Sequence, residues 1–207
     1  MLIARSSPPR TLTPPQLCLI LWKNNFFIPI QNENSKLTGA ILRLIERQRD
    51  GQKIDEELLK RVVGSFVSLG LDEADINGVS LDVYKEHFEI PFLEATEKYY
   101  ELRSETFLAG NSIPDYLRRA EEWLKEEEDR VERYLNTSTK EPLIGECVRA
   151  LFREHPKLMD EESQSLFDYD DDDLQRMHAL ITRAPEGLEP LRNKLEEHMR
   201  KAGLPLA

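Results

Sequence analysis

Hydrophobic residues recur every three or four positions along most of the chain, and no segment alternates with a period of two. A spacing close to 3.6 residues places apolar side chains on one face of an α-helix, whereas a half-buried strand alternates at every second residue. Consecutive helices joined by short polar segments therefore predict an all-α fold, an α-solenoid or stacked bundle without a sheet.

The two longest predicted helices occupy residues 80–134 and are joined at Gly110 and Asn111. The inward row expected for the first helix is Leu81, Tyr84, Phe88, Phe92, Ala95, Tyr99 and Leu102. The inward row expected for the second is Ile113, Leu117, Ala120, Leu124, Val131 and Leu135, with a break at Glu127 and Glu128. Each row stacks on one helix face, so both helices are predicted to be amphipathic.

Two local signals set the boundaries of these long helices. Ser112 followed by Asp115 predicts a capping box at the start of the second helix. Pro91 has no backbone N–H and cannot bond the carbonyl of His87, which lies four residues earlier. We therefore expect the first helix to kink or split near Glu89.

Shorter helices are predicted on both sides of this pair. Their expected ranges are residues 35–50, 55–70, 141–152, 157–167, 174–181 and 186–201. The helix at 55–70 should begin at a capping Asp55 and bury Leu58, Leu59, Val62, Val63, Phe66 and Leu69. Gly51 and Gly203 are expected to stop their helices in a left-handed conformation. Ser138 and Glu141 predict a capping box for the helix at 141–152.

The first fifteen residues differ from the rest of the chain, because they contain four prolines, two arginines and no acid. Arginine and serine without acids resemble a transit peptide, but the proline clusters oppose the amphipathic helix that such a peptide needs. We expect residues 1–15 to be a disordered leader or a gene-model artefact.

The amino-acid composition limits which partners the protein can bind and in which cellular compartment it is expected. The chain has 207 residues, 40% of them hydrophobic, and a net charge of −11. An acidic balance argues against nucleic acid or an anionic membrane as a partner, since both require basic patches. No apolar run of 18 residues exists, so no membrane span is predicted. Cys18 and Cys147 are expected to pack in cores as free thiols in a reducing, intracellular compartment.

Three segments resemble the cullin family. Residues 88–100 read F-E-x-x-F-L-x-x-T-x-x-Y-Y, and residues 116–139 continue with R-R-A-E-x-x-L-x-E-E-x-x-R-x-x-x-Y-L-x-x-S-T from Arg118 onward. Residues 37–55 read L-x-x-A-I-L-x-L-I-E-x-x-R-D-G-x-x-I-D, followed by V-V-x-S-F-V-x-L-G. The ordered co-occurrence is specific, and it is most similar to the cullins of SCF ubiquitin ligases.

This resemblance implies a fold and a role. Cullin repeats are five-helix units stacked into an elongated stalk, so residues 16–34 would be the tail of a first repeat, 35–156 a second, and 157–207 a partial third. The implied role is a non-catalytic scaffold segment of an SCF-type ligase in the cytoplasm and nucleus. Its implied partners are other ligase subunits, a Skp1-like adaptor and a RING-finger protein in the full-length family.

The resemblance also implies that this chain is a middle-stalk fragment in which the adaptor- and RING-binding regions are largely absent. Such a fragment should expose apolar helix faces at both ends and self-associate. The residues expected to be exposed are Leu17, Ile20, Leu21, Leu191, Leu195 and Met199.

No catalytic, cofactor or metal site is predicted, although several clusters were candidates. The acids at 168 and 170–173 lack the glycine and terminal glutamate of a calcium loop and favour a helix N-terminus instead. The histidines His87, His155, His178 and His198 have no zinc-binding spacing and are expected at the surface or half-buried. The glutamates Glu94, Glu97, Glu101 and Glu105 predict a solvated helix face.

Two other classes of protein share parts of this pattern. A helical-rod vesicle-tethering subunit of the exocyst type would show the same periodicity and acidity, and a basic lipid-facing patch would favour it. A four-helix di-metal enzyme would need Glu-x-x-His pairs, which the chain lacks.

Overall fold

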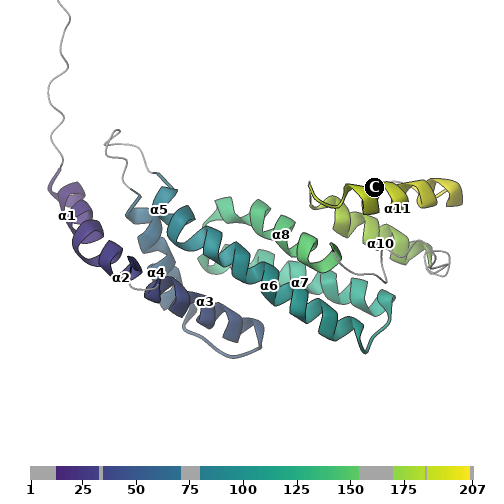
Figure 1. The fold of residues 1–207 in the computed structure, drawn as a ribbon, viewed down its shortest axis with the longest axis horizontal. Helices are drawn as coiled ribbons and strands as arrows, with labels where there is room; N and C mark the ends of the chain where they lie inside the picture. The colour runs from purple at the N-terminus through teal and green to yellow at the C-terminus, as the bar shows by residue number, and fades with distance from the viewer. Residues whose placement is uncertain (1–12, 33–34, 71–79, 154–169, 185, 206–207) are drawn as a thin grey trace, which may run out of the picture. The chain divides into compact units, whose positions relative to one another are not determined.

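The computed structural model describes residues 13–32, 35–70, 80–153, 170–184 and 186–205 (Figure 1). Within these ranges the chain is helical and contains no strand, which confirms the predicted all-α class. The leader up to residue 12, the polar loop at 72–78 and the helix predicted at 157–167 lie outside the described residues. The chain divides into two compact units, Met1–Pro91 and Phe92–Ala207, and each is described by itself.

The first unit consists of short helices and two π-helices. In chain order they are α1 (Pro14–Trp22), the first π-helix (Lys23–Phe27), α2 (Ile28–Asn32), α3 (Lys36–Arg49), α4 (Glu56–Ser68), α5 (Asp82–Tyr84) and the second π-helix (Lys85–Glu89). Aromatic rings form its core. Phe66 of α4 lies 5.1 Å from Phe27 and 5.9 Å from Phe88, measured between ring centroids. Both π-helices thus contribute a ring that packs on α4.

Local signals in this unit behave largely as predicted. Asp55 accepts a hydrogen bond from the Leu58 amide at 2.9 Å, and Gly51 has a φ of 82° after α3. The segment after α1 stays helical to Asn32, because a π-turn accommodates Pro29. One expectation is wrong. Leu58 is 49% exposed rather than inward, since α4 buries only one side of its apolar face.

The second unit contains the longest helices. They are α6 (Ile90–Leu108), whose first two residues belong to the first unit, α7 (Ile113–Tyr134), a 3₁₀ turn (Thr137–Thr139), α8 (Lys140–Phe152), α10 (Asp171–Thr182) and α11 (Glu189–Ala202). The Ser112 hydroxyl accepts from the Asp115 amide and donates to the Asp115 carboxylate, so Ser112 is confirmed as the N-cap of α7. The predicted box for α8 is wrong, because Asn136 caps the 3₁₀ turn instead.

The buried row of α6 is not the row of apolar residues predicted from the sequence. It runs through Phe92, Thr96, Tyr100, Ser104 and Leu108, whereas Leu102 is 67% exposed. Thr96 and Ser104 tolerate burial because each hydroxyl has a partner: Thr96 donates to the Phe92 carbonyl at 2.7 Å, and Ser104 bonds Tyr116. These bonds allow polar residues to lie in the buried face, which does not run through Ala95, Tyr99 and Leu102.

Three further differences concern burial. Glu127, expected to interrupt the inward row of α7, is fully buried within it. Leu191, Leu195 and Met199 of α11 were expected to be exposed but are buried, and α11 packs against α10. Cys18 was expected in a core but is exposed, while Cys147 is buried as predicted.

The buried row of α7 yields a matched pair of substitutions. Leu124 is fully buried and Leu102 is mostly exposed, so the same change to aspartate tests opposite environments. Leu124→Asp should lower the free energy of unfolding by about 3 kcal/mol or more, because it buries an unpaired charge. Leu102→Asp should change it by less than about 0.5 kcal/mol. Urea unfolding followed by circular dichroism measures both, and equal effects would contradict the assigned burial.

Candidate functional site

The titratable residues singled out from the sequence do not converge on a catalytic centre in the part of the chain that is described. Asp171, Asp172 and Asp173 lie in the first turn of α10, where acids favour the positive helix end, and Asp173 pairs with Arg176 at 3.2 Å. Asp168 and His155 lie outside the described residues. No group of three or more His, Cys, Asp or Glu residues is placed to hold a metal ion among those described.

The histidines occupy three different environments. His87 is half-buried and its ring meets Phe27 edge-on at 5.5 Å, and His198 is half-buried on α11. His178 is 3% exposed, deeper than predicted, and its Nε2 lies 3.6 Å from the Glu196 carboxylate. The contacts of His87 and His178 are thus with an aromatic ring and a carboxylate of neighbouring elements.

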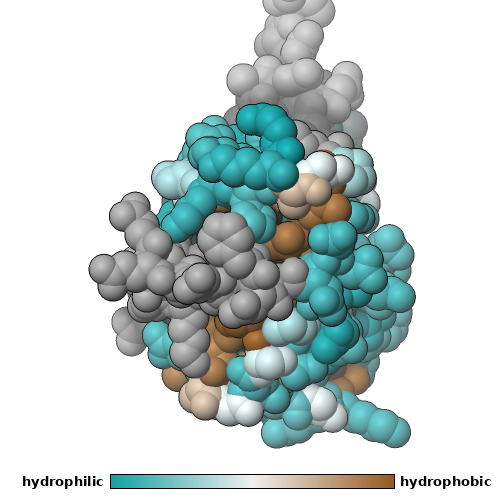
Figure 2. All heavy atoms as spheres, turned by 90° about the vertical axis from the view of Figure 1, so that its right-hand side faces the viewer, coloured by the Kyte–Doolittle hydropathy of each residue, from teal (hydrophilic) through white to brown (hydrophobic). Residues whose placement is uncertain are grey.

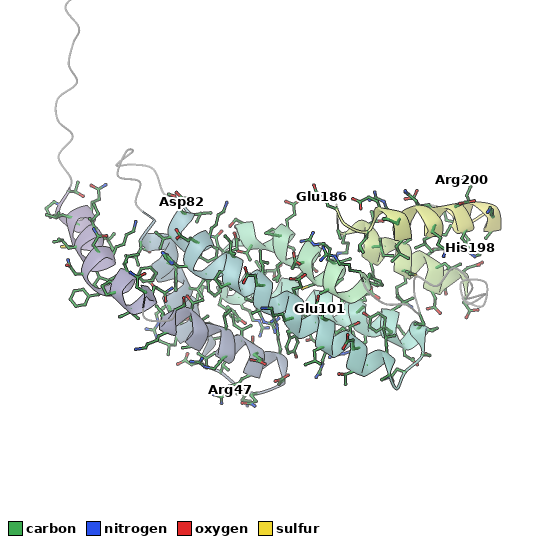
Figure 3. All side chains as sticks on the ribbon, viewed as in Figure 1. Arg47, Asp82, Glu101, Glu186, His198 and Arg200 are labelled. Carbon is green, nitrogen blue, oxygen red and sulfur yellow. The ribbon has the colours of Figure 1, made fainter. Side chains whose placement is uncertain are left out.

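The glutamate face of α6 is solvated, as predicted. Glu94, Glu101 and Glu105 are exposed, and the half-buried Glu97 lies 3.5 Å from Arg153. Charged side chains elsewhere also point outward, as Arg47 and Arg200 do in Figure 3. Figure 2 shows mostly hydrophilic side chains on the face that it draws, with hydrophobic atoms in smaller areas between them. These charged side chains therefore face solvent.

One open hollow of about 380 Å³ lies where α7, α8 and α10 meet in the second unit. Three of its charged groups are paired: Glu128 accepts from Arg183 at 2.6 Å and lies 3.7 Å from Lys140. Thr137, Ser138 and Glu141 also line it. The hollow is therefore an open, polar groove crossed by ion pairs.

The residues that carry a specific physical task are instead buried polar groups that join different helices. In the first unit, Pro91 leaves the carbonyl of His87 without its usual helical donor. The Thr38 hydroxyl of α3 donates to this carbonyl at 2.5 Å, and the Gln31 amide of α2 approaches it at 3.4 Å. Gln31 also donates to Thr38 at 2.7 Å. The bonds to this carbonyl thereby hold α2 and α3 against the second π-helix.

Both π-helices carry the same sequence motif. Lys23–Pro29 and Lys85–Pro91 each read K-x-x-F-x-I-P, and each π-turn closes with a bond from the isoleucine amide to the lysine carbonyl. The wider turn removes one α-helical bond just where proline could not supply a donor. This repeat was visible in the sequence and is the signal that could have located both junctions.

In the second unit, a buried ion pair joins α6 to α7. The Tyr100 hydroxyl of α6 donates to the Glu127 carboxylate at 2.7 Å, and the Arg130 guanidinium binds the same oxygen. All three side chains are nearly inaccessible, at 1%, 0% and 2% exposed respectively. A buried carboxylate is tolerated only when cationic and hydrogen-bonding partners offset its desolvation, so these three residues must be placed together.

A second chain of hydrogen bonds continues from α6 through α7 to α8. The Tyr116 hydroxyl donates to the Leu151 carbonyl at 2.7 Å. Because a tyrosine has one hydroxyl proton, Ser104 must be the donor in its 2.5 Å contact with Tyr116. Leu151 lies in the last turn of α8, where helical carbonyls lack an in-helix donor. Burial raises the pKa of Tyr116, so its hydroxyl keeps this proton.

The junction at His87 gives a double-mutant test. Thr38→Val removes the hydroxyl that bonds the His87 carbonyl at nearly constant side-chain volume, and should cost about 1–3 kcal/mol of unfolding free energy. Pro91→Ala supplies a backbone N–H that can bond the same carbonyl, so Thr38→Val should cost less in that background. Thr106→Val, at an exposed hydroxyl on α6, is the control. Equal costs of Thr38→Val in both backgrounds, measured by urea unfolding, would show that Pro91 is not what creates the need for Thr38.

None of the described helices is both long and apolar enough to cross a membrane.

Comparison with known proteins places this geometry in a family. The model of the cullin α-solenoid domain matches residues 7–207. Cullin-1 of Dictyostelium discoideum is 40% identical over 189 residues, which are 91% of this chain and 24% of that protein. Cullin-1 of Caenorhabditis elegans is 38% identical, and covers 90% of this chain and 25% of its own length. Cullin-3 of Dictyostelium discoideum is 32% identical, with 81% and 22% covered.

The chain thus spans about a quarter of the length of the curated relatives that it matches. These matches give the vesicle-tethering alternative no support, and the division into repeats at residues 16–34, 35–156 and 157–207 stays a prediction. The family model matches nearly the whole chain, and the described residues are helical throughout their folded elements: this chain belongs to the cullin family and is built as a cullin α-solenoid.

Proposed function

We propose that this chain is a scaffold segment of an SCF-type, cullin-RING ubiquitin ligase. The observation that carries the proposal is a comparison within one organism. The chain is 40% identical to Cullin-1 of Dictyostelium discoideum and 32% identical to Cullin-3 of the same species. This difference favours the Cullin-1 type, which the sequence motifs also resemble.

The internal contacts suit a segment whose task is to hold other subunits at a fixed separation. A solenoid transmits position only if neighbouring helices cannot slide, and directional hydrogen bonds oppose sliding more strongly than apolar contact alone. The bonds from Thr38, Tyr100 and Tyr116 each connect two different helices. Ion pairs between Arg176 and Glu121 and between Arg183 and Glu128 add contacts from α10 to α7.

Three finer statements belong to the same proposal. The segment performs no catalysis itself, and ubiquitin transfer belongs to other subunits of the ligase. Its partners are ligase subunits, with a Skp1-like adaptor and a RING-finger protein at the two ends of the assembled scaffold. It acts in the cytoplasm and nucleus, without nucleic acid or membrane as a partner, in agreement with its net charge of −11.

A chimera tests the scaffold role. The matching segment of Dictyostelium discoideum Cullin-1 is replaced by residues 17–204 of this chain, and the chimera is purified with adaptor, substrate receptor and RING subunit. We expect it to co-purify with both end subunits and to ubiquitinate an SCF substrate at a rate close to that of the parent. The chimera with Leu124→Asp should lose transfer, whereas the chimera with Leu102→Asp should keep it.

The readouts separate assembly from spacing. Circular dichroism checks that the chimera is folded, and co-purification checks that adaptor and RING subunit are bound. A folded chimera that binds both subunits and still transfers no ubiquitin would contradict the proposal. The segment would then not hold the two subunits at a separation that allows transfer.

A further inference from the structure

Ser138 begins a sequence pattern that helix capping does not explain. An acid follows three residues after three serines of the chain, Ser112, Ser138 and Ser165, and after no threonine. Ser112 uses this pattern to cap α7, as its bonds to Asp115 show. Ser165 lies outside the described residues. Ser138 and Glu141 predict the same cap for α8, but α8 has no side-chain cap hydrogen bond. The pattern at Ser138 is therefore available for another role.

The surroundings of Ser138 distinguish it from the other hydroxyl residues of its turn. Its amide donates to the Asn136 side chain at 3.0 Å, which caps the 3₁₀ turn. Ser138 itself is exposed and lines the hollow between α7, α8 and α10. Thr139 is fully buried, and the exposed Thr137 has Lys140 rather than an acid three residues later. Ser138 is thus the residue of this turn that is both accessible and followed by an acid.

The backbone around Ser138 can be extended at low cost. Ser138 lies in a 3₁₀ turn of three residues, whose hydrogen bonds have poorer geometry than those of an α-helix. The first turn of α8 follows, and Pro142 in it has no N–H donor to lose. Few backbone bonds therefore break when residues 136–142 open locally to fit the groove of an enzyme that binds extended substrates.

The charges that line the same hollow can hold a phosphate on Ser138. Lys140 and Arg183 supply two cations, and Glu128 lies 3.7 and 2.6 Å from them, respectively. A phosphate carries about −1.5 to −2 charge at pH 7 and three strong acceptor oxygens, which exceeds the single charge of a carboxylate. Arg183 should therefore exchange Glu128 for the phosphate. Glu141, the other acid of the lining, is exposed and can turn toward solvent.

We propose that Ser138 is a phosphorylation site for a protein kinase that selects serines with an acid three residues later. In the transfer, the Ser138 hydroxyl oxygen forms a bond to the γ-phosphorus of ATP, and the bond from that phosphorus to the bridging oxygen breaks. ADP leaves, and the hydroxyl proton passes to the catalytic base of the kinase. The phosphate then binds Arg183, so an ion pair between α7 and α10 is replaced by one between α8 and α10. The inference does not depend on the proposed ligase function.

Phosphorylation of the folded full chain by casein kinase 2 and ATP tests the site. Peptide mass spectrometry over time should find phosphate on Ser138 well before Ser112, whose hydroxyl is bonded to Asp115 in its cap. Glu141→Gln removes the acid that a basic kinase groove recognises, and should lower the initial rate at Ser138 several-fold. Glu122→Gln, at an exposed position on α7, is the control and should leave the rate unchanged. Circular dichroism verifies that both variants remain folded.

³¹P NMR of the phosphorylated chain, in a Ser165→Ala background, tests where the phosphate binds. Nearby cations lower the second pKa of a phosphate, so its titration should lie at lower pH than that of a phosphorylated peptide of residues 134–143. Arg183→Gln should return the titration toward that of the peptide, whereas Arg200→Gln, at an exposed position on α11, should not. Absence of phosphate on Ser138, equal rates at Ser138 and Ser112, or a titration that Arg183→Gln leaves unchanged would each overturn the proposal.

Discussion

The packing of the second unit depends on a buried carboxylate that needs bonding partners. Glu127 is fully buried on α7, and a buried charge without partners costs several kcal/mol, comparable to the whole stability of a domain. Tyr100 of α6 and Arg130 one turn further along α7 supply those partners. The register of α6 against α7 is therefore constrained, since a slip of one residue would separate the hydroxyl from the carboxylate.

The first unit applies the same constraint to a backbone group. Pro91 removes a donor, the His87 carbonyl is left without one, and Thr38 with Gln31 takes over from two other helices. In each case a polar group that its own helix cannot satisfy is bonded by a neighbouring helix. Apolar packing supplies most of the stability, but it is non-directional, whereas these bonds specify how the helices are aligned. The proposed scaffold role would depend on that alignment.

Sequence patterns predicted where helices begin and end better than which side they bury. Asp55, Ser112 and Gly51 act through neighbouring residues, so their effect could be inferred locally. Burial depends on residues distant in the sequence. Counting only apolar side chains assigned Leu102 to the core and missed Glu127, whose partner Tyr100 lies on another helix. It also missed Thr96, whose hydroxyl is satisfied by the Phe92 carbonyl of its own helix. A glutamate inside an apolar row and a proline inside a predicted helix were the available signals.

Hydrogen exchange measured by mass spectrometry tests most directly whether Glu127 locks α6 to α7. Amides of both helices should exchange together in the slowest class of the second unit, as expected for one cooperative unit. Glu127→Gln leaves Arg130 buried without its carboxylate and should accelerate exchange across both helices, whereas Glu122→Gln, at an exposed position on α7, should not. Acceleration confined to the turn of α7 around residue 127, with α6 unaffected, would contradict the account.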